Sequence, residues 1–268
     1  NGATLFKFSQ IEKYLEDFRF NNKNDNLGGF FKIKHKNHFI LIDVGEPPQK
    51  KFSKSYQSGP LSFEYFLDGE KIITNSGFGI HISKRAEFLS RLTACQSTLT
   101  INETSITKFE KNEMINKIFG NSIKNSFKAF DFSSINENNL KGCSASNNGY
   151  EKKFGCIHKR EIYLDHSNNR LIGADHIYKK SDGIPIRYVF RFHLNPELSA
   201  VKTMSGKGAL IQISKNKSLL FTVKDENIEI EKSLYLGGKK ILDNTCITIS
   251  GNLVNKDKFL HWEIKKNI

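Results

Sequence analysis

The sequence of 268 residues predicts an all-β protein, a large antiparallel β-sandwich preceded by a short helix. Apolar and polar residues alternate in most of the chain, as they do in strands that have one buried face. Turn-forming residues recur roughly every ten residues, which is the spacing of a sandwich. No linker rich in Pro, Gly and Ser divides the chain, so we expect one domain over residues 1–268.

The first elements can be placed in order. The apolar residues of LFKFSQIEKYLEDF, residues 5–18, follow helical spacing, and Ser9 with Glu12 could form a capping box. In residues 29–45 two apolar runs flank the polar KHKN, which is typical of a hairpin. A second hairpin is predicted in residues 61–77, where Asp68-Gly69 is a strong turn dipeptide.

Alternating segments continue to the end of the chain, and each predicts a strand or a hairpin. Residues 102–143 are less regular, and we interpret them as a loop with edge strands. The alternating segments are STLTINETSI, KREIYLDHSNNRLIGADHIY, IRYVFRFHLN, GALIQISKNKSLLFTV, NIEIEKSLYLG and NTCITISGNL.

The bulk properties restrict the class of partner. The formal net charge of +13 reflects either a Lys-rich composition or attraction to a polyanion. No nucleic-acid-binding motif accompanies the charge, so an acidic polysaccharide is favoured over nucleic acid. No run of about 18 apolar residues occurs, so we expect no membrane span.

The cysteines do not indicate a metal site. The sequence has four cysteines, and no two of them form a CxxC pair: they are Cys95, Cys143, Cys156 and Cys246. The sequence also has no phosphate loop, no nucleophile elbow and no other spacing typical of a metal site. We therefore expect neither a cofactor nor a metal. The cysteines are either four buried thiols or, in an exported protein, include one disulfide between Cys143 and Cys156.

Several polar residues are candidates for chemistry. Tyr150 and His158, together with Arg and Gln side chains, could serve acid–base catalysis on an anionic substrate. Each has a structural alternative. His158 could be a surface histidine, His193 a hydrogen-bonded core histidine, and Glu64 a buried partner of Arg91.

Taken in order, the motifs resemble the C-terminal β domain of the heparinase II/III-like family of polysaccharide lyases, in particular its bacterial heparinase-like subgroup. The resemblance covers nearly the whole chain. The matching pieces are GGFFKIKHKNHFILIDVGEPP, GPLSFEYFLDGEKIITNSGFG, RLTACQSTLTI, NGYEKKFGCIHKREIYL, LIGADHIY, RYVFRFHLNP and the closing TCITISGNL and HWEIKK.

The resemblance implies a function for a longer protein. Family members join an N-terminal α/α toroid to this β-sandwich and cleave uronate-containing glycans by β-elimination. Most catalytic groups lie on the toroid, which we expect to be missing from this chain, so the chain alone should be inactive. The resemblance also suggests a periplasmic or cell-envelope location, with the cytoplasm as the alternative.

The sequence departs from the family pattern where the β domain usually supplies histidines. Gln57 stands before the LSFE strand, and Gln96 stands in the R-T-x-x-H-x-T segment. Asn75 stands where zinc-binding members tend to have Asp, and Asn147 and Asn148 replace a His-Asp pair. Amides form hydrogen bonds but do not take a proton near neutral pH and are poor zinc ligands.

We therefore expect Gln57, Glu64, Arg91 and Gln96 to contact substrate, converging in one polar depression where Glu64 orients Arg91 toward a uronate carboxylate or sulfate. Tyr150 and His158 are expected to assist. Two other functions remain open: a non-catalytic glycan-binding module, and a structural domain that supports the toroid.

Overall fold

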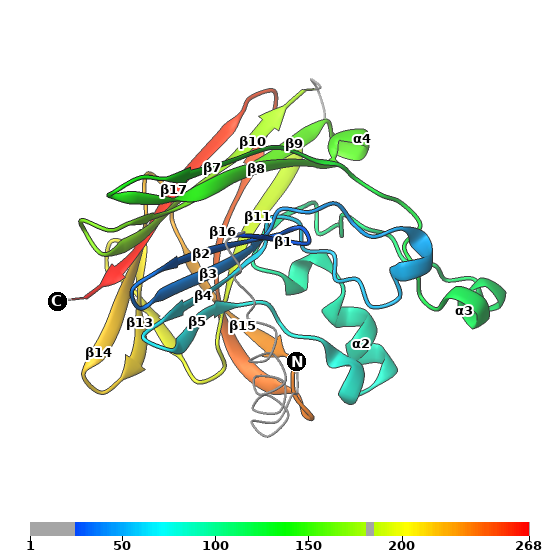
Figure 1. Cartoon of the computed structure of the whole chain (residues 1–268), viewed down its shortest axis with the longest axis horizontal. Helices are drawn as coiled ribbons and strands as arrows, with labels where there is room; N and C mark the ends of the chain where they lie inside the picture. Colours follow the sequence, from blue (N-terminus) through cyan, green and yellow to red (C-terminus); the bar gives the residue numbers. More distant parts are fainter. Residues whose placement is uncertain (1–24, 181–184, 268) are drawn as a thin grey trace, which may run out of the picture.

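A computed structural model describes residues 25–180 and 185–267, and it confirms the predicted antiparallel sandwich of two sheets (Figure 1). The helix predicted in residues 5–18 lies outside the described residues. The first sheet has nine strands in the order β1-β2-β3-β4-β5-β11-β16-β15, with β6 also paired to β11. The second has eight strands in the order β12-β13-β14-β17-β10-β9-β8-β7.

The strands of the first sheet are β1 (Asn26–Leu27), β2 (Phe30–His35), β3 (His38–Asp43), β4 (Phe63–Leu67), β5 (Glu70–Thr74), β6 (Leu99–Ile101), β11 (Ile186–Leu194), β15 (Glu229–Tyr235) and β16 (Leu242–Leu253). Those of the second are β7 (Ala129–Asn136), β8 (Leu140–Tyr150), β9 (Cys156–Asp165), β10 (Arg170–Lys179), β12 (Ser199–Lys202), β13 (Gly208–Ser214), β14 (Lys217–Val223) and β17 (Lys258–Lys266).

Short helices lie in the connections. They are η1 (Lys50–Phe52), η2 (Gly79–His81), α2 (Lys84–Ser90), η3 (Thr93–Cys95), α3 (Glu113–Phe119) and α4 (Glu151–Phe154). Figure 1 shows α2 and α3 together at one end of the sandwich, beside the strands of the first sheet. The segment predicted as loop and edge strands holds the edge strand β7, but also α3 and the start of the interior strand β8, which the irregular pattern did not indicate.

Local turn chemistry explains the predicted hairpins. Asp68 and Gly69 both adopt positive φ, 57° and 84°, as a two-residue turn between β4 and β5 requires. In the hairpin of β2 and β3, Lys36 takes positive φ within the polar KHKN turn. Both predicted hairpins are confirmed.

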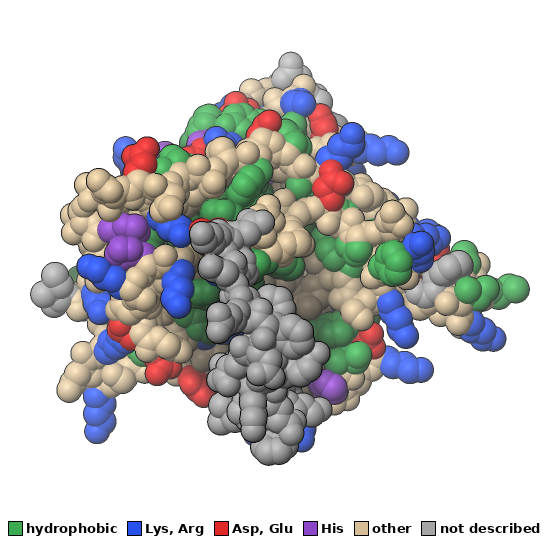
Figure 2. All heavy atoms as spheres, viewed as in Figure 1, with side chains coloured by type: hydrophobic (Ala, Val, Ile, Leu, Met, Phe, Trp, Pro, Cys, Tyr) green, Lys and Arg blue, Asp and Glu red, His purple; other side chains and the backbone are tan. Residues whose placement is uncertain are grey.

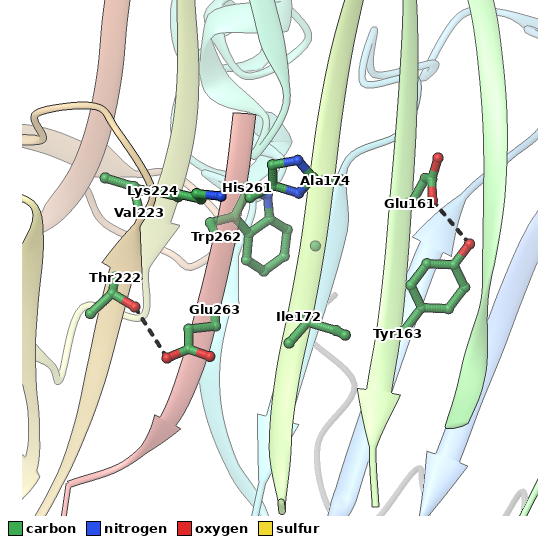
Figure 3. A pocket seen from close by; sticks show the side chains of 11 residues that line it. Glu161, Tyr163, Ile172, Ala174, Thr222, Val223, Lys224, His261, Trp262 and Glu263 are labelled. Atoms are coloured by element: carbon green, nitrogen blue, oxygen red, sulfur yellow. Dashed lines mark hydrogen bonds between the residues drawn. The ribbon is translucent and has the colours of Figure 1, made fainter. Parts of the chain in front are cut away.

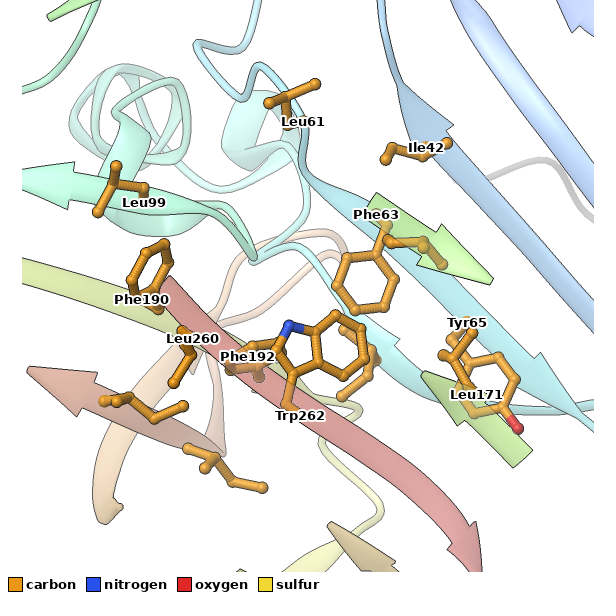
Figure 4. Close-up of a cluster of buried hydrophobic side chains, with 14 of the residues drawn as sticks. Ile42, Leu61, Phe63, Tyr65, Leu99, Leu171, Phe190, Phe192, Leu260 and Trp262 are labelled. Atoms are coloured by element: carbon orange, nitrogen blue, oxygen red, sulfur yellow. The ribbon is translucent and has the colours of Figure 1, made fainter. Parts of the chain in front are cut away.

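The core lies between the sheets and is rich in aromatic rings (Figure 4). The Trp262 indole stacks on Phe63, with ring centroids 5.5 Å apart, and meets Phe192 edge-on at 5.2 Å. Gly173 on the neighbouring strand leaves room for the indole, because a Cβ atom there would lie 2.1 Å from Trp262 Cζ2. Rings of this size contribute much of the apolar area that stabilises a sandwich.

One buried ionic cluster joins the two sheets. Arg160 on β9 donates from Nε to Asp175 on β10 at 2.7 Å, and Trp262 Nε1 donates to the same carboxylate at 2.9 Å. Arg160 Nη1 donates across the sandwich to the backbone carbonyls of Leu61, at 2.8 Å, and Ser97, at 2.7 Å. Arg160 therefore holds the segments that lead into β4 and β6 against the second sheet.

Candidate functional site

A polar pocket of about 330 Å³ lies on the first sheet, where β3 and β5 end and β4 begins. Its polar groups come from the ends of these strands and from the segments that precede β4 and β6. Its polar lining includes Asp43, Gln57, Ser62, Glu64, Asn75 and Gln96. Of the four residues expected to contact substrate, the pocket unites three: Gln57, Glu64 and Gln96.

The alternation of β4 determines which residues face the pocket. Glu64 and the preceding Ser62 line it, whereas Phe63 and Tyr65 point into the core and are almost completely buried. Successive side chains on a strand point to opposite faces, so the LSFE motif places a polar pair over an apolar pair.

The two glutamines differ in how firmly they are held. Gln96 is buried and its Nε2 donates to the Ser90 carbonyl at 2.8 Å. Gly59 makes room for it, because a Cβ atom at that position would lie 2.9 Å from Gln96 Cγ. Gln57 is half-buried, and its side chain has no hydrogen bond to any other described residue. Its amide is therefore available to a ligand.

The Asn75 side chain completes the group of amides. Its Oδ1 accepts a hydrogen bond from the Ser97 backbone N–H at 2.8 Å, and its Nδ2 lies 3.5 Å from Ser62 Oγ. One end of this amide therefore supports the backbone next to Gln96, while the other faces the pocket.

Glu64 does not orient Arg91, so that prediction is wrong. The Glu64 carboxylate pairs instead with Lys71 on the adjacent strand, with Nζ and Oε2 2.8 Å apart, and accepts a longer hydrogen bond from the Thr74 hydroxyl at 3.3 Å. The two hairpin strands bring these residues together locally, without any contribution from α2.

Arg91 is fully buried and does not line the pocket, contrary to expectation. Its Nε donates to the Tyr56 carbonyl and its Nη2 to the Ser53 carbonyl, both at 2.9 Å. The guanidinium carbon lies 4.1 Å from the centre of the Phe109 ring. Burial lowers the pKa of Arg91 to about 10. Arg91 thus anchors the loop that carries Gln57, and the hydrogen bonds of its Nε and Nη2 go to the backbone.

Sequence reasoning assigned no role to Asp43, the last residue of β3. Its half-buried carboxylate lines the pocket, and its Oδ1 accepts a hydrogen bond from the Gly45 N–H at 3.1 Å. Burial raises the pKa of Asp43 to about 7, since removal from water disfavours the charged form. The available signal was an acidic residue at the end of an apolar strand, two residues before the glycine of DVG.

Neither expected assisting residue lies at the pocket. Tyr150 is buried, its hydroxyl donates to the Thr104 carbonyl at 2.7 Å, and burial raises its pKa well above the ordinary value. His158 is also buried, with Nε2 2.7 Å from Asp175 Oδ1, and burial lowers its pKa. The alternative of a surface His158 is therefore wrong, and the assisting role expected of Tyr150 and His158 stays a prediction.

The remaining sequence candidates have structural roles. His193 is a core histidine, as one interpretation held: Nε2 lies 3.0 Å from the Ala94 carbonyl and Nδ1 lies 3.1 Å from Ser233 Oγ. Cys143 and Cys156 are free thiols, as are the other two cysteines. The described part of the chain brings together no group of three or more His, Cys, Asp or Glu side chains suited to a metal ion.

A second pocket, of about 620 Å³, lies on the outer face of the second sheet and has no predicted site residue in its lining (Figure 3). Its floor includes Ile172 and Ala174 on β10. Its acidic groups are already engaged, because Glu263 pairs with Arg170 at 2.8 Å and Tyr163 donates to Glu161 at 3.2 Å.

On the face shown in Figure 2, Lys and Arg side chains are spread over the surface, with Asp and Glu between them.

None of the helices in the described residues has the length and apolar character needed to cross a membrane.

Comparison with known proteins places this fold. A family model described as Heparinase II/III-like, C-terminal, matches residues 23–263. The chain belongs to this family. No curated protein matches the heparinase II/III-like chain.

Solved structures share the architecture of this heparinase II/III-like domain. The heparan sulfate lyase HepC from Pedobacter heparinus matches with a TM-score of 0.74 and 13% identity, over 97% of this chain and 41% of its own. A structure of Heparinase III matches with a TM-score of 0.70 and 14% identity, over 97% of this chain and 42% of its own. The chain therefore spans less than half the length of these proteins, and the likeness at these identities concerns the fold.

Proposed function

We propose that this heparinase II/III-like domain forms one wall of the substrate cleft in a polysaccharide lyase that cleaves uronate-containing glycans by β-elimination. The supporting observation is the convergence of Gln57, Asn75 and Gln96 with two carboxylates in one pocket. Family membership and the fold shared with heparan sulfate lyases agree with this class of substrate.

The amides that stand at the positions of the family histidines suit binding better than proton transfer. In β-elimination a base removes the proton next to the uronate carboxylate, the C–O bond to the leaving sugar breaks, and an acid protonates the leaving oxygen. Amide side chains hydrogen-bond sugar hydroxyls but perform neither proton transfer. The reaction would then depend on groups from a toroid domain of the same protein, with this domain holding the glycan.

A non-catalytic glycan-binding module is the second candidate. It is favoured by the glutamines at the positions where the family usually has histidines, since such a pocket could bind a sugar without any cleavage. The same pocket would serve either function. The two candidate functions therefore differ in whether the glycan is cleaved, and not in which residues bind it.

Activity of the full-length protein decides between them. Incubation with heparan sulfate, alginate or chondroitin should raise the ultraviolet absorbance of unsaturated uronate with at least one substrate, whereas the 268-residue chain alone should give no rise. Gln57→Ala should lower the rate, and Gln49→Ala, at an exposed glutamine outside the pocket, should not. A full-length protein that binds these glycans but cleaves none would favour the binding module.

A further inference from the structure

The charges of the pocket on the first sheet are unsuited to an acidic sugar. Asp43 and Glu64 supply two carboxylates. Among the lining residues Lys71 is the single Lys or Arg, and its ammonium group is held by Glu64 at 2.8 Å. Recognition of a uronate or sulfate normally uses the paired donors of Arg or a free Lys. Among the described residues, the pocket therefore has no uncommitted cation in its lining for such a group.

Arg91 does not supply this cation from behind the lining. Its Nε and Nη2 are bonded to the carbonyls of Tyr56 and Ser53, and its Nη1 is buried without a hydrogen-bond partner among the described residues. The side chain is fully buried and is not part of the pocket lining, so none of its nitrogens meets a ligand there. With a pKa of about 7, the Asp43 carboxyl is charged in about half of the molecules at neutral pH. An anion entering the pocket would meet that charge without a free cation among the lining residues, which is unfavourable in a partly desolvated site.

The pocket offers neutral hydrogen-bonding groups beside aromatic surface. The Gln57 amide is free of hydrogen bonds to described residues, and the amide of Asn75 and hydroxyl of Ser62 lie close by. Phe78 and Tyr235 are among the aromatic residues in the lining. A volume of about 330 Å³ is at the small end for ligand pockets and suits one sugar unit better than a long chain segment.

We propose that this pocket is a subsite for an uncharged sugar unit of the glycan, such as an N-acetylhexosamine, and that it excludes the uronate unit. This inference rests on the proposed function and specifies which part of the glycan the domain holds. Amides and hydroxyls bind the hydroxyl and acetamido groups of the sugar, and its apolar C–H face lies against the aromatic lining. The uronate carboxylate must then be bound by groups outside this pocket.

Three defined oligosaccharides test the subsite by nuclear magnetic resonance on the 268-residue chain. Chitotriose has only N-acetylglucosamine, triguluronate has only uronate, and a heparosan tetrasaccharide alternates both types. We expect chitotriose and the heparosan tetrasaccharide to shift the amide signals of Gln57, Asn75 and Gln96, and triguluronate to leave them unchanged. Equal or tighter binding of triguluronate at these signals would overturn the proposal, as would the absence of any shift with all three.

Two variants sharpen the test. Gln57→Ala should weaken chitotriose binding about fivefold, the loss of roughly one hydrogen bond, whereas Gln49→Ala should leave it unchanged. Gln57→Arg introduces the missing cation and should produce triguluronate binding that fades at high salt. Lyase activity of the full-length protein is measured separately. If the full-length protein cleaves heparan sulfate but the chitotriose and heparosan signals of the chain do not shift, the subsite alone is rejected. If these signals shift but the full-length protein cleaves no glycan, the lyase function alone is rejected.

Discussion

Arg160 and Asp175 meet in the dry interior of the sandwich, where Arg160 Nε lies 2.7 Å from Asp175 Oδ1 and both side chains are fully buried. The pair also supports the candidate site, because Arg160 holds the carbonyls of Leu61 and Ser97. Leu61 directly precedes Ser62 in the sequence, and Ser97 directly follows Gln96. The ionic pair thus fixes the backbone beneath the pocket.

Loss of Asp175 should therefore be severe. Asp175→Ala leaves the Arg160 guanidinium buried without its counter-charge, and we expect the free energy of unfolding to fall by about 3–5 kcal/mol. Denaturation in urea measures the effect. Asp243→Ala, at an exposed aspartate, is the control and should change stability by less than about 0.5 kcal/mol. A similarly small change for Asp175→Ala would show that the cluster contributes little.

The close contact between Gly173 and Trp262 predicts a specific packing defect. Gly173→Ala should lower the free energy of unfolding by about 1–3 kcal/mol or more, because the new methyl group must displace the indole. Trp262 is the one tryptophan in the sequence, so its fluorescence spectrum reports the displacement directly. Gly238→Ala is the matched control, since a Cβ atom added there would lie 3.8 Å from the Lys240 carbonyl oxygen, an ordinary van der Waals contact. Unchanged Trp262 emission in folded Gly173→Ala would contradict this packing account.

Arg91 is expected to act on stability and on the position of Gln57. Arg91→Ala removes one donor from each of two carbonyls, at Tyr56 and Ser53, and the packing of a fully buried side chain, and we expect a loss of about 2–4 kcal/mol in the free energy of unfolding. Glycan binding should weaken by the same factor at low and high salt, because the effect is transmitted through the loop. Arg85→Ala, on the exposed side of α2, should alter neither property. A loss of affinity that shrinks as salt is raised would instead indicate direct contact with an anionic group.

Asp43 should make stability depend on pH near neutrality. Its folded-state pKa of about 7 exceeds the value of about 3.9 expected in the unfolded chain, so the folded state binds the proton more tightly. Stability should fall as pH rises from about 4 to about 7, by at most about 4 kcal/mol, and then level off. Asp43→Asn should remove this part of the pH dependence. Carbon-13 titration of the Asp43 carboxyl measures its pKa, and a value near 4 would contradict the prediction.

Asp68 provides a control of opposite sign. Hydrogen bonds from Lys217 and Asn37 lower its pKa to about 2, so its contribution is present above about pH 4 and is lost as pH falls toward 2. Asp68→Asn should therefore reduce stability at neutral pH, where Asp43→Asn increases it.

The sequence by itself determined the fold class, the hairpin at Asp68-Gly69 and the two faces of the LSFE strand. These features depend on a period of two residues and on local turn conformation, both of which can be read along the chain. It also indicated the family, and the resemblance to that family predicted that Gln57 and Gln96 would lie at one site.

Only the tertiary structure decided which charges meet and which are buried. Glu64 and Arg91 were expected to pair, but Lys71 lies closer to Glu64, and Arg91 finds backbone carbonyls 35 and 38 residues away. Likewise, the alternation of apolar and polar residues placed His158 on a strand but did not show that it would be buried and bonded to Asp175. It also did not show that burial would raise the pKa of Asp43. Pairing and desolvation depend on contacts between segments far apart in the chain, and the alternation within one strand carries no information about them.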